Sequence, residues 1–189
     1  MSRPWHKMDD LERRKWQDPE AILAGIGVRK GSTVMDIGCG HGFFTIPAAR
    51  LVGASGRVYG IDISDVAITQ IAKKASAEGL GNLTLAVGRA EDAVFCEACA
   101  DVVFFGIVLH DFEEPEKVLS NAERMLKPRG RLANLDWKKE SMAFGPPLEK
   151  RFDEARATAL IESAGLVVEA TAGTGPYHYM ITARRKQRS

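Results

Sequence analysis

The sequence lacks the features that mark secreted, membrane-spanning or strongly charged proteins. Three cysteines among 189 residues cannot all pair with one another, which argues against a disulfide scaffold. The 26 basic and 25 acidic residues leave a net charge of +1, so no global field attracts nucleic acid or an anionic membrane. The longest apolar run, residues 102–109, is far shorter than the roughly 20 residues that span a bilayer. Residues 1–7 carry charge but no apolar core of a secretory signal. We therefore expect a cytoplasmic protein with reduced thiols and no membrane span.

The composition that is present is that of an ordinary globular protein. Apolar residues make up 45% of the chain and charged residues 27%, which excludes wholesale disorder. A chain of this length fits one domain, and such a domain buries enough surface to need no metal or disulfide staple. We expect residues 1–189 to form a single domain, with residues 1–27 as a helical lid segment.

Short β-branched runs alternate with longer amphipathic segments, which is the pattern of a mostly parallel α/β sheet. The expected strands are 33–37, 57–62, 83–87, 101–108 and 131–136, followed by an antiparallel hairpin of 166–170 and 177–183. The expected helices are 9–25, 43–52, 64–78, 116–126 and 148–164. The pattern predicts a doubly wound α/β fold, with a seven-stranded sheet, helices on both faces and a C-terminal antiparallel hairpin.

A glycine-rich turn follows the first expected strand. Asp36, Gly38, Gly40 and Gly42 lie where this strand gives way to a helix. Ligands of open α/β sheets bind at this carboxyl edge, and glycine lets the backbone approach them closely. Asp62 follows 20 residues after Gly42, at the end of the second strand, which is the spacing of an acid that accepts both ribose hydroxyls of a nucleoside. The turn and Asp62 together predict a nucleoside-containing ligand.

The turn does not match the dinucleotide fingerprint, because Phe43 stands where that pattern needs its third glycine. The turn instead has an acid followed by three alternating glycines. With this turn the sequence resembles the class I (Rossmann-like) S-adenosylmethionine-dependent methyltransferases, and among these it resembles the ubiquinone/menaquinone methyltransferase-like (type 11) group. The resemblance covers roughly residues 19–183. Its motifs, in order, are VMDIGCGHG at 34–42, VYGIDIS at 58–64, GRAE at 88–91, DVV at 101–103, LHD at 109–111 and LKPRG at 126–130.

The resemblance implies S-adenosyl-L-methionine as the cofactor and no metal. The cofactor-binding residues that it implies are Asp36, Gly38, Gly40, Gly42, Thr45, Asp62, Ile63, Arg89, Ala90, Glu91 and Gly106. At the methionine end, Asp36 would lie near the ammonium, Thr45 near the carboxylate and Gly106 beneath the sulfonium. The three glycines would run along the methionine and the ribose.

At the adenosine end the resemblance implies that Asp62 binds the ribose, Ile63 packs on the adenine face and Ala90 donates its backbone N–H to adenine N1. The family usually has an Asp or Asn where this chain has Arg89, and a guanidinium cannot accept from the adenine amino group. Glu91 or the acid after it is the expected substitute, unless the amino group faces water.

His110 and Asp111 follow the fourth expected strand and are the predicted catalytic residues. Methyl transfer depends mainly on positioning, and a base is required only if the acceptor must lose a proton. His110 suits that role because its ordinary pKa is near 6.5. The alternative is that both residues orient the loop and cap a helix.

The expected acceptor is a small molecule, which the sequence does not identify, and a homodimer is left open. Aromatic residues lie where similar proteins build a substrate lid, although they could equally close the core: Trp5, His6, Trp16, Trp137, Tyr177, His178 and Tyr179. The alternatives are a cofactor-binding module without chemistry, an RNA methyltransferase that uses the basic residues 13–15, 138–139 and 184–188, and a metalloid methyltransferase that uses Cys39, Cys96 and Cys99.

Overall fold

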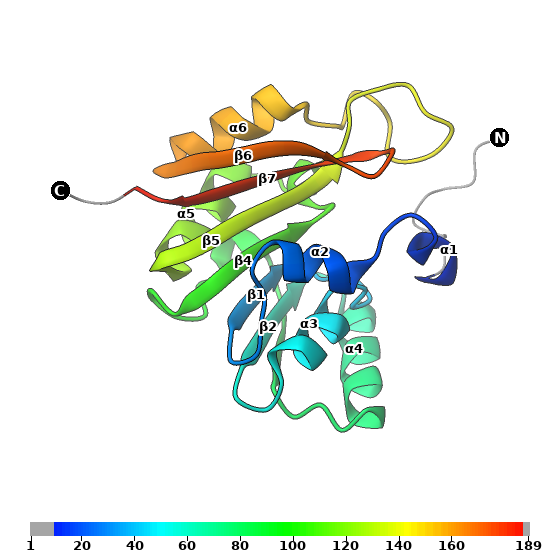
Figure 1. Cartoon of the computed structure of the whole chain (residues 1–189), viewed down its shortest axis with the longest axis vertical. Coiled ribbons are helices and arrows are strands. Elements are labelled where there is room, and N and C mark those ends of the chain that lie inside the picture. The colour runs from blue at the N-terminus through cyan, green and yellow to red at the C-terminus, as the bar shows by residue number, and fades with distance from the viewer. Residues whose placement is uncertain (1–9, 187–189) are drawn as a thin grey trace.

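The computed structural model describes residues 10–186, which contain one sheet flanked by helices (Figure 1). The seven strands are β1 Thr33–Ile37, β2 Arg57–Asp62, β3 Leu83–Val87, β4 Ala100–Gly106, β5 Leu126–Trp137, β6 Leu166–Thr174 and β7 His178–Arg185. Their spatial order is β3-β2-β1-β4-β5-β7-β6. The strands β1 to β5 pair in parallel, and β7 pairs antiparallel to both β5 and β6. The predicted fold class is confirmed.

The helices cover both faces of the sheet (Figure 1). They are α1 Asp10–Arg14, α2 Pro19–Gly25, α3 Thr45–Val52, α4 Asp65–Ala77, α5 Pro115–Met125 and α6 Glu154–Ser163, with short 3-10 turns η2 Ala90–Asp92 and η3 Leu109–Asp111. None of the helices described is long and apolar enough to cross a membrane.

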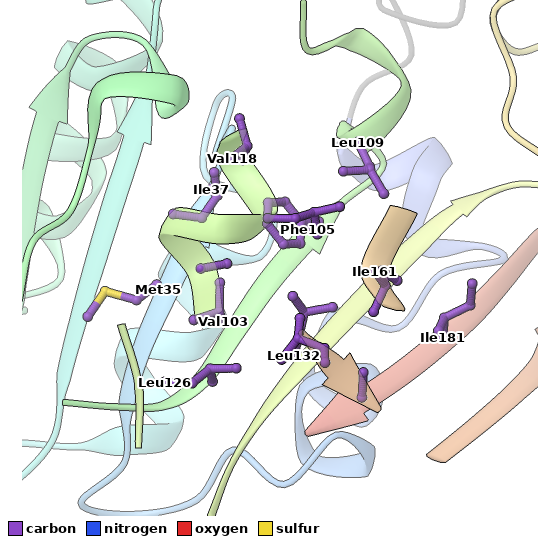
Figure 2. Packing of buried hydrophobic residues seen from close by; sticks show 14 of the residues in the cluster. Met35, Ile37, Val103, Phe105, Leu109, Val118, Leu126, Leu132, Ile161 and Ile181 are labelled. Atoms are coloured by element: carbon purple, nitrogen blue, oxygen red, sulfur yellow. The ribbon is translucent and has the colours of Figure 1, made fainter. Parts of the chain in front are cut away.

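The core lies on both sides of the central strands because successive side chains of a strand point to opposite faces. On β4, Val103 and Phe105 face α5 and α6, where they pack with Val118 and Ile161 (Figure 2). Phe104, between them in the chain, packs on the opposite side against residues of α2 and α3. A strand that is buried on both faces needs apolar residues at every position, which explains the unbroken apolar run in this part of the sequence.

The two expected helices that differ most from the structure do so for the same reason. The segment predicted as one helix at 9–25 is divided into α1 and α2, and residue 9 lies outside the described residues. The division falls at Asp18, whose Oδ1 accepts from the Ala21 N–H at 3.0 Å, with Pro19 as the first residue of α2. Likewise α6 begins at Glu154, because Asp153 caps it by accepting from the Arg156 N–H at 2.8 Å. Both acids are N-caps inside regions that periodicity alone predicts as helix.

The fourth strand also ends earlier than the predicted 101–108. Its last residue is Gly106, and Ile107 adopts φ 66°, a left-handed conformation that is rare for a β-branched residue. The chain therefore turns away from the sheet directly after Gly106. This bend brings Val108 and the following 3-10 turn over the end of β1.

We expect Asp18→Ala to lower the free energy of unfolding by about 1 kcal/mol, or the melting temperature by roughly 2–4 °C, because α2 loses its N-cap. Urea denaturation measures this change. The matched control is Glu162→Ala at an exposed position of α6, where a change within about 0.5 kcal/mol is expected. Equal stabilities of the two variants would contradict the capping role of Asp18.

Candidate active site

Two adjoining cavities lie at the carboxyl ends of β1, β2 and β4. The first has a volume of about 300 Å³ and is bounded by α1, the glycine turn and the residues after β4. The second has a volume of about 290 Å³ and extends along the ends of β2 and β3 to η2. Gly38, Asp62, Val108 and Asp111 line both cavities. Together they form the crevice predicted from the glycine turn.

The three glycines of the turn have different roles. Gly38 has φ 71°, and a Cβ there would stand 2.4 Å from the Val108 Cγ2, so only glycine fits under the loop after β4. Gly40 has φ 51°, and a Cβ there would project into open space at the wall of the first cavity. Gly42 lines neither cavity, and its Cβ would meet the Ile71 Cγ1 at 2.8 Å. Gly42 therefore serves the packing of α3 on α4, whereas Gly38 and Gly40 shape the ligand space.

Asp36 forms a buried acidic wall of the first cavity. Its Oδ2 accepts a hydrogen bond from the Thr45 Oγ1 at 2.6 Å. Burial raises the pKa of Asp36 to about 6, and the nearby charge of Asp62 acts in the same direction. The Thr45 hydroxyl and the positive charge of Arg13 partly offset this rise in the pKa. A cationic ligand group beside Asp36 would relieve the cost of this buried carboxylate.

Thr45 is not where the resemblance implied. The residue is fully buried and lines neither cavity, and its hydroxyl is used by Asp36. Thr45 therefore orients the Asp36 carboxylate and does not itself reach the cavity.

The Asp62 carboxylate is fixed by the backbone at the boundary of the two cavities. Its Oδ2 accepts from the Gly40 N–H at 2.8 Å and its Oδ1 from the Ser64 N–H at 3.0 Å. Carboxylate oxygens have further lone pairs, which remain available to a ligand. This location between the two cavities is the one expected for an acid that binds a ribose.

The second cavity gathers the residues predicted for the adenine end: Ile63, Arg89, Ala90 and Glu91 all line it. The Arg89 Nη2 pairs with the Glu113 Oε2 at 2.9 Å and lies 3.5 Å from the Glu91 Oε1. Glu91 is buried, whereas Asp92 is exposed and pairs with Lys117. Of the two expected substitutes, Glu91 is the carboxylate that adjoins the cavity.

Asp111 and His110 are separated by the fold. Asp111 lines both cavities, but the His110 side chain is fully buried and lines neither. The His110 Nδ1 lies 2.7 Å from the Asp136 Oδ1, and its Nε2 lies 3.6 Å from the Asp111 Oδ2. Sequence reasoning missed Asp136, which stands near the end of β5. Its signal in the sequence was an acid at the carboxyl end of the expected strand 131–136, the edge of the sheet where Asp62 also lies.

The charge of Asp136 governs the titration of His110. Burial acts to lower the pKa of His110, but the hydrogen bond to Asp136 and the negative charges of Asp136 and Asp111 outweigh it. Lys150 opposes them weakly, and the net effect raises the pKa above 6.5. The Asp136 Oδ1 also accepts from the Trp137 N–H at 2.8 Å, which fixes the carboxylate against the backbone.

Aromatic residues form the apolar wall of the first cavity. Trp16, Phe43, Phe44 and Trp137 line it. His178 stacks behind them on Trp16, with centroids 5.2 Å apart and planes 7° apart. Burial and nearby positive charges lower the pKa of His178 to about 3, so this ring is neutral and acts as a packing surface.

The other aromatic residues considered as a lid have other places. Tyr177 packs against Trp16 and Phe144 behind the cavity wall. Tyr179 is fully buried in the core that faces α6, and its hydroxyl donates to the Phe152 carbonyl at 3.2 Å. The predicted lid residues 5 and 6 lie outside the described residues.

The cysteines do not form a trio. Cys96 and Cys99 pair with each other, with their Cα atoms 6.1 Å apart. Cys39 is free and buried in a different cluster, beside Ile46 and Ile71. Burial raises the pKa of its thiol. Among the described residues no group of three or more His, Cys, Asp or Glu side chains could hold a metal ion.

A family model described as methyltransferase domain matches residues 28–180. The chain belongs to this methyltransferase family. It is similar to the ubiquinone/menaquinone biosynthesis C-methyltransferase UbiE of Salmonella arizonae, at 32% identity over 160 residues, which are 84% of this chain and 61% of that protein. It is also 35% identical over 111 residues to the nocamycin O-methyltransferase of Saccharothrix syringae, covering 59% of this chain and 40% of that one. The chain thus spans only part of the length of these curated relatives.

A solved structure supports the same family. The S-adenosylmethionine-dependent methyltransferase from Aquifex aeolicus matches with a TM-score of 0.85 and 30% identity, covering 94% of this chain and 98% of that one. The resemblance to class I methyltransferases of the type 11 group is confirmed, and S-adenosylmethionine is the cofactor of the family.

The crevice of this methyltransferase fits such a cofactor. The open space beside Gly40, which a Cβ would enter, belongs to the cavity that Asp36 and Asp62 also line. A bound methyl donor would find room along the glycine turn, with the Asp36 carboxylate available to its ammonium and the Asp62 carboxylate to its ribose. Gly106 lines the same cavity, and its Cβ would stand 2.9 Å from the Phe44 ring, so this floor position is also restricted to glycine.

We expect Asp62→Ala to weaken the binding of S-adenosylhomocysteine about 10- to 100-fold, roughly 1.5–3 kcal/mol, because charge-assisted hydrogen bonds are lost. Isothermal titration calorimetry measures the affinity, and circular dichroism checks that the variant is folded. The control is Asp92→Ala, which removes an exposed acid outside the cavity and leaves the affinity unchanged. Unaltered binding by the Asp62 variant would remove the ribose assignment.

We expect Asp136→Asn to destabilise the protein in a pH-dependent manner. A raised folded-state pKa means that His110 contributes stability below its unfolded value of 6.5, which is lost as the pH rises through the higher folded value. Urea denaturation should therefore show a deficit of roughly 1–3 kcal/mol at pH 5.5 that shrinks by pH 8.5. Asp111→Asn, at the longer distance, serves as the control with a smaller effect. A deficit that grows with pH would contradict the charged pair.

Proposed function

We propose that this chain transfers the methyl group of S-adenosylmethionine to a small, flat and weakly polar acceptor. The observation that carries the proposal is the first cavity, in which the glycine turn and Asp111 meet a wall of Trp16, Phe44 and Trp137. Aromatic walls of this kind hold planar, apolar ligands by stacking and by exclusion of water. Its relatives include enzymes named as quinone C-methyltransferases and an O-methyltransferase, which is consistent with such acceptors.

In this proposal, different residues of the crevice bind the cofactor and the methyl acceptor. The bound cofactor supplies an activated methyl group on its sulfonium. Asp36, Gly40 and Asp62 hold the cofactor from the methionine end to the ribose, and the aromatic wall positions the acceptor opposite. Alignment of the two reactants provides much of the acceleration, because it replaces a bimolecular encounter with a preorganised one.

Asp111 provides the carboxylate that is placed to take a proton from the methyl acceptor. It lines both cavities, whereas His110 lies behind it and does not reach either. The arrangement Asp136–His110–Asp111 supports a role for His110 in orienting the Asp111 carboxylate. In this proposal the base is Asp111, and His110 is a positioning residue.

An RNA acceptor receives less support. Two of the basic residues near the C-terminal end are engaged in ion pairs, Arg185 with Glu123 at 2.7 Å and Arg184 with Glu169 at 3.4 Å. Paired arginines offer less to phosphates than free ones, because phosphate binding depends on unneutralised charge. The metalloid alternative also loses support, since Cys39 lies apart from Cys96 and Cys99.

The first experiment is a thermal-shift panel of S-adenosylmethionine, S-adenosylhomocysteine, NAD and FAD. A ligand at 100 times its Kd adds about 2.7 kcal/mol of stability by mass action. We expect both adenosyl thio-compounds to raise the melting temperature, and NAD and FAD to leave it unchanged. A shift by NAD alone would overturn the proposed function.

The second experiment tests the acceptor class with phenols, hydroquinones and short peptides, using methyl-labelled donor. We expect transfer to the planar small molecules. For an acceptor found in this way, Trp16→Ala should raise KM at least about tenfold through lost stacking, with the affinity for S-adenosylhomocysteine within twofold of the wild type. Trp16→Phe is the conservative control and should recover most of the affinity. Transfer to peptides alone, or an intact KM in the alanine variant, would contradict the aromatic acceptor site.

A further inference from the structure

Arg13 is a charged group in the wall of the first cavity, which the sequence analysis considered only as part of a basic cluster for RNA. It belongs to α1, which lies beyond the carboxyl ends of the parallel strands (Figure 1). Its guanidinium carbon lies 3.9 Å from the centroid of the Phe43 ring and 5.1 Å from that of Phe44. Its Nε donates to the Gln17 Oε1 at 2.6 Å. These contacts fix the guanidinium at the start of α3, directly after the glycine turn.

One nitrogen of Arg13 lacks a partner. Its Nη2 is buried and makes no hydrogen bond to any of the residues that the structure describes. Burial lowers the pKa of Arg13 to about 10, which still leaves the guanidinium charged at neutral pH. A buried, charged N–H without an acceptor is costly, so an anionic group in the cavity would complete this arrangement.

The charges around the first cavity match a zwitterion. Asp10, Asp36, Asp62 and Asp111 line it, and of its described lining residues Arg13 alone carries a permanent positive charge. The methionine moiety of the cofactor bears an ammonium and a carboxylate on the same carbon, so their two partners must be close neighbours. Arg13 and Asp36 meet this condition, since each charge shifts the pKa of the other.

The helix that carries Arg13 is attached to the glycine turn. The Lys74 Nζ donates to the His41 carbonyl at 3.0 Å and pairs with the Asp10 Oδ2 at 3.3 Å. Lys74 thus links α4, the turn and the first residue of α1. The start of α1 is thereby held against the turn, and Arg13 lines the same cavity as Gly38 and Gly40.

We propose that Arg13 binds the α-carboxylate of the cofactor's methionine moiety through its free Nη2, opposite Asp36. This inference rests on the proposed function for the cofactor site. It gives α1 a direct part in cofactor binding, and it fills the role that Thr45 does not take. A carboxylate suits this nitrogen better than a carbonyl or hydroxyl of the acceptor, because a charge-assisted hydrogen bond is roughly twice as strong as a neutral one.

The test is a binding cycle with two ligands, S-adenosylhomocysteine and its decarboxylated analogue, 5′-deoxy-5′-(3-aminopropylthio)adenosine. The analogue keeps the amine and the nucleoside but has no carboxylate. We expect the wild type to bind S-adenosylhomocysteine about 10- to 100-fold more tightly than the analogue by calorimetry. In Arg13→Gln this preference should fall to less than threefold, through weaker binding of S-adenosylhomocysteine and unchanged binding of the analogue.

The chain offers a matched control in Arg14→Gln. Arg14 is the next residue of α1, but its guanidinium pairs with Glu20 at 2.8 Å on the surface, so the ligand preference should equal that of the wild type. Arg13→Lys keeps the charge without the planar fork and should retain part of the preference. Circular dichroism and the unchanged affinity for the analogue show that each variant is folded.

Three results would overturn the proposal. An equal loss of affinity for both ligands in Arg13→Gln would make Arg13 a structural residue of α1. An unchanged preference would place the carboxylate elsewhere in the cavity. If the wild type bound neither ligand, the cofactor assignment itself would fail, a result that differs from the first two because no variant is needed to see it.

Discussion

The hydrogen bond from the Gly40 N–H to the Asp62 carboxylate is the contact on which the crevice depends. It joins the turn after β1 to the end of β2, two neighbouring parallel strands. The Gly38 and Cys39 N–H groups reinforce it by donating to the Ile61 carbonyl at 2.9 and 3.0 Å. With the turn fixed in this way, the space beside Gly40 is part of the first cavity, and the Asp62 carboxylate lies at the boundary of the two cavities. Both depend on the parallel pairing of β1 with β2, which places the two strand ends side by side.

Two further carboxylates are buried near the crevice, and each is stabilised differently. Asp36 receives one neutral hydrogen bond from Thr45, so burial dominates and its pKa rises. Asp136 has an ionisable partner in His110, and against the lowering effect of burial its hydrogen bond and negative charge raise the pKa of that residue. Asp36 therefore gains from a cationic ligand, whereas the Asp136 Oδ1 has its partners inside the protein, in the His110 ring and the Trp137 N–H. This difference separates a carboxylate that faces ligand from one that supports the structure behind it.

The local pattern of the sequence predicted most of the fold, since the strands, the sheet class and the terminal hairpin agree with the structure. The errors lie at the ends of elements. Strand β4 ends earlier and β5 begins earlier than expected, and two helices begin later, where Asp18 and Asp153 act as caps inside apparently continuous periodicity. Periodicity reports which residues face the core over several turns, but a cap is a single hydrogen bond that leaves the pattern of apolar residues unchanged. The ends of these helices are therefore set by single side-chain hydrogen bonds, which the periodicity of apolar residues does not reveal.

The sequence by itself determined the glycine turn, the acid after β2 and the family, because each is encoded by residues close together in the chain and by the allowed backbone conformations of glycine. Only the tertiary structure decided which side chains share a cavity. It brought Arg13 to the cavity that Asp36 lines, placed Asp136 against His110 and withdrew His110 and Thr45 from the ligand space. These contacts join residues of different elements, and their distances follow from strand order and register, which no short stretch of sequence specifies.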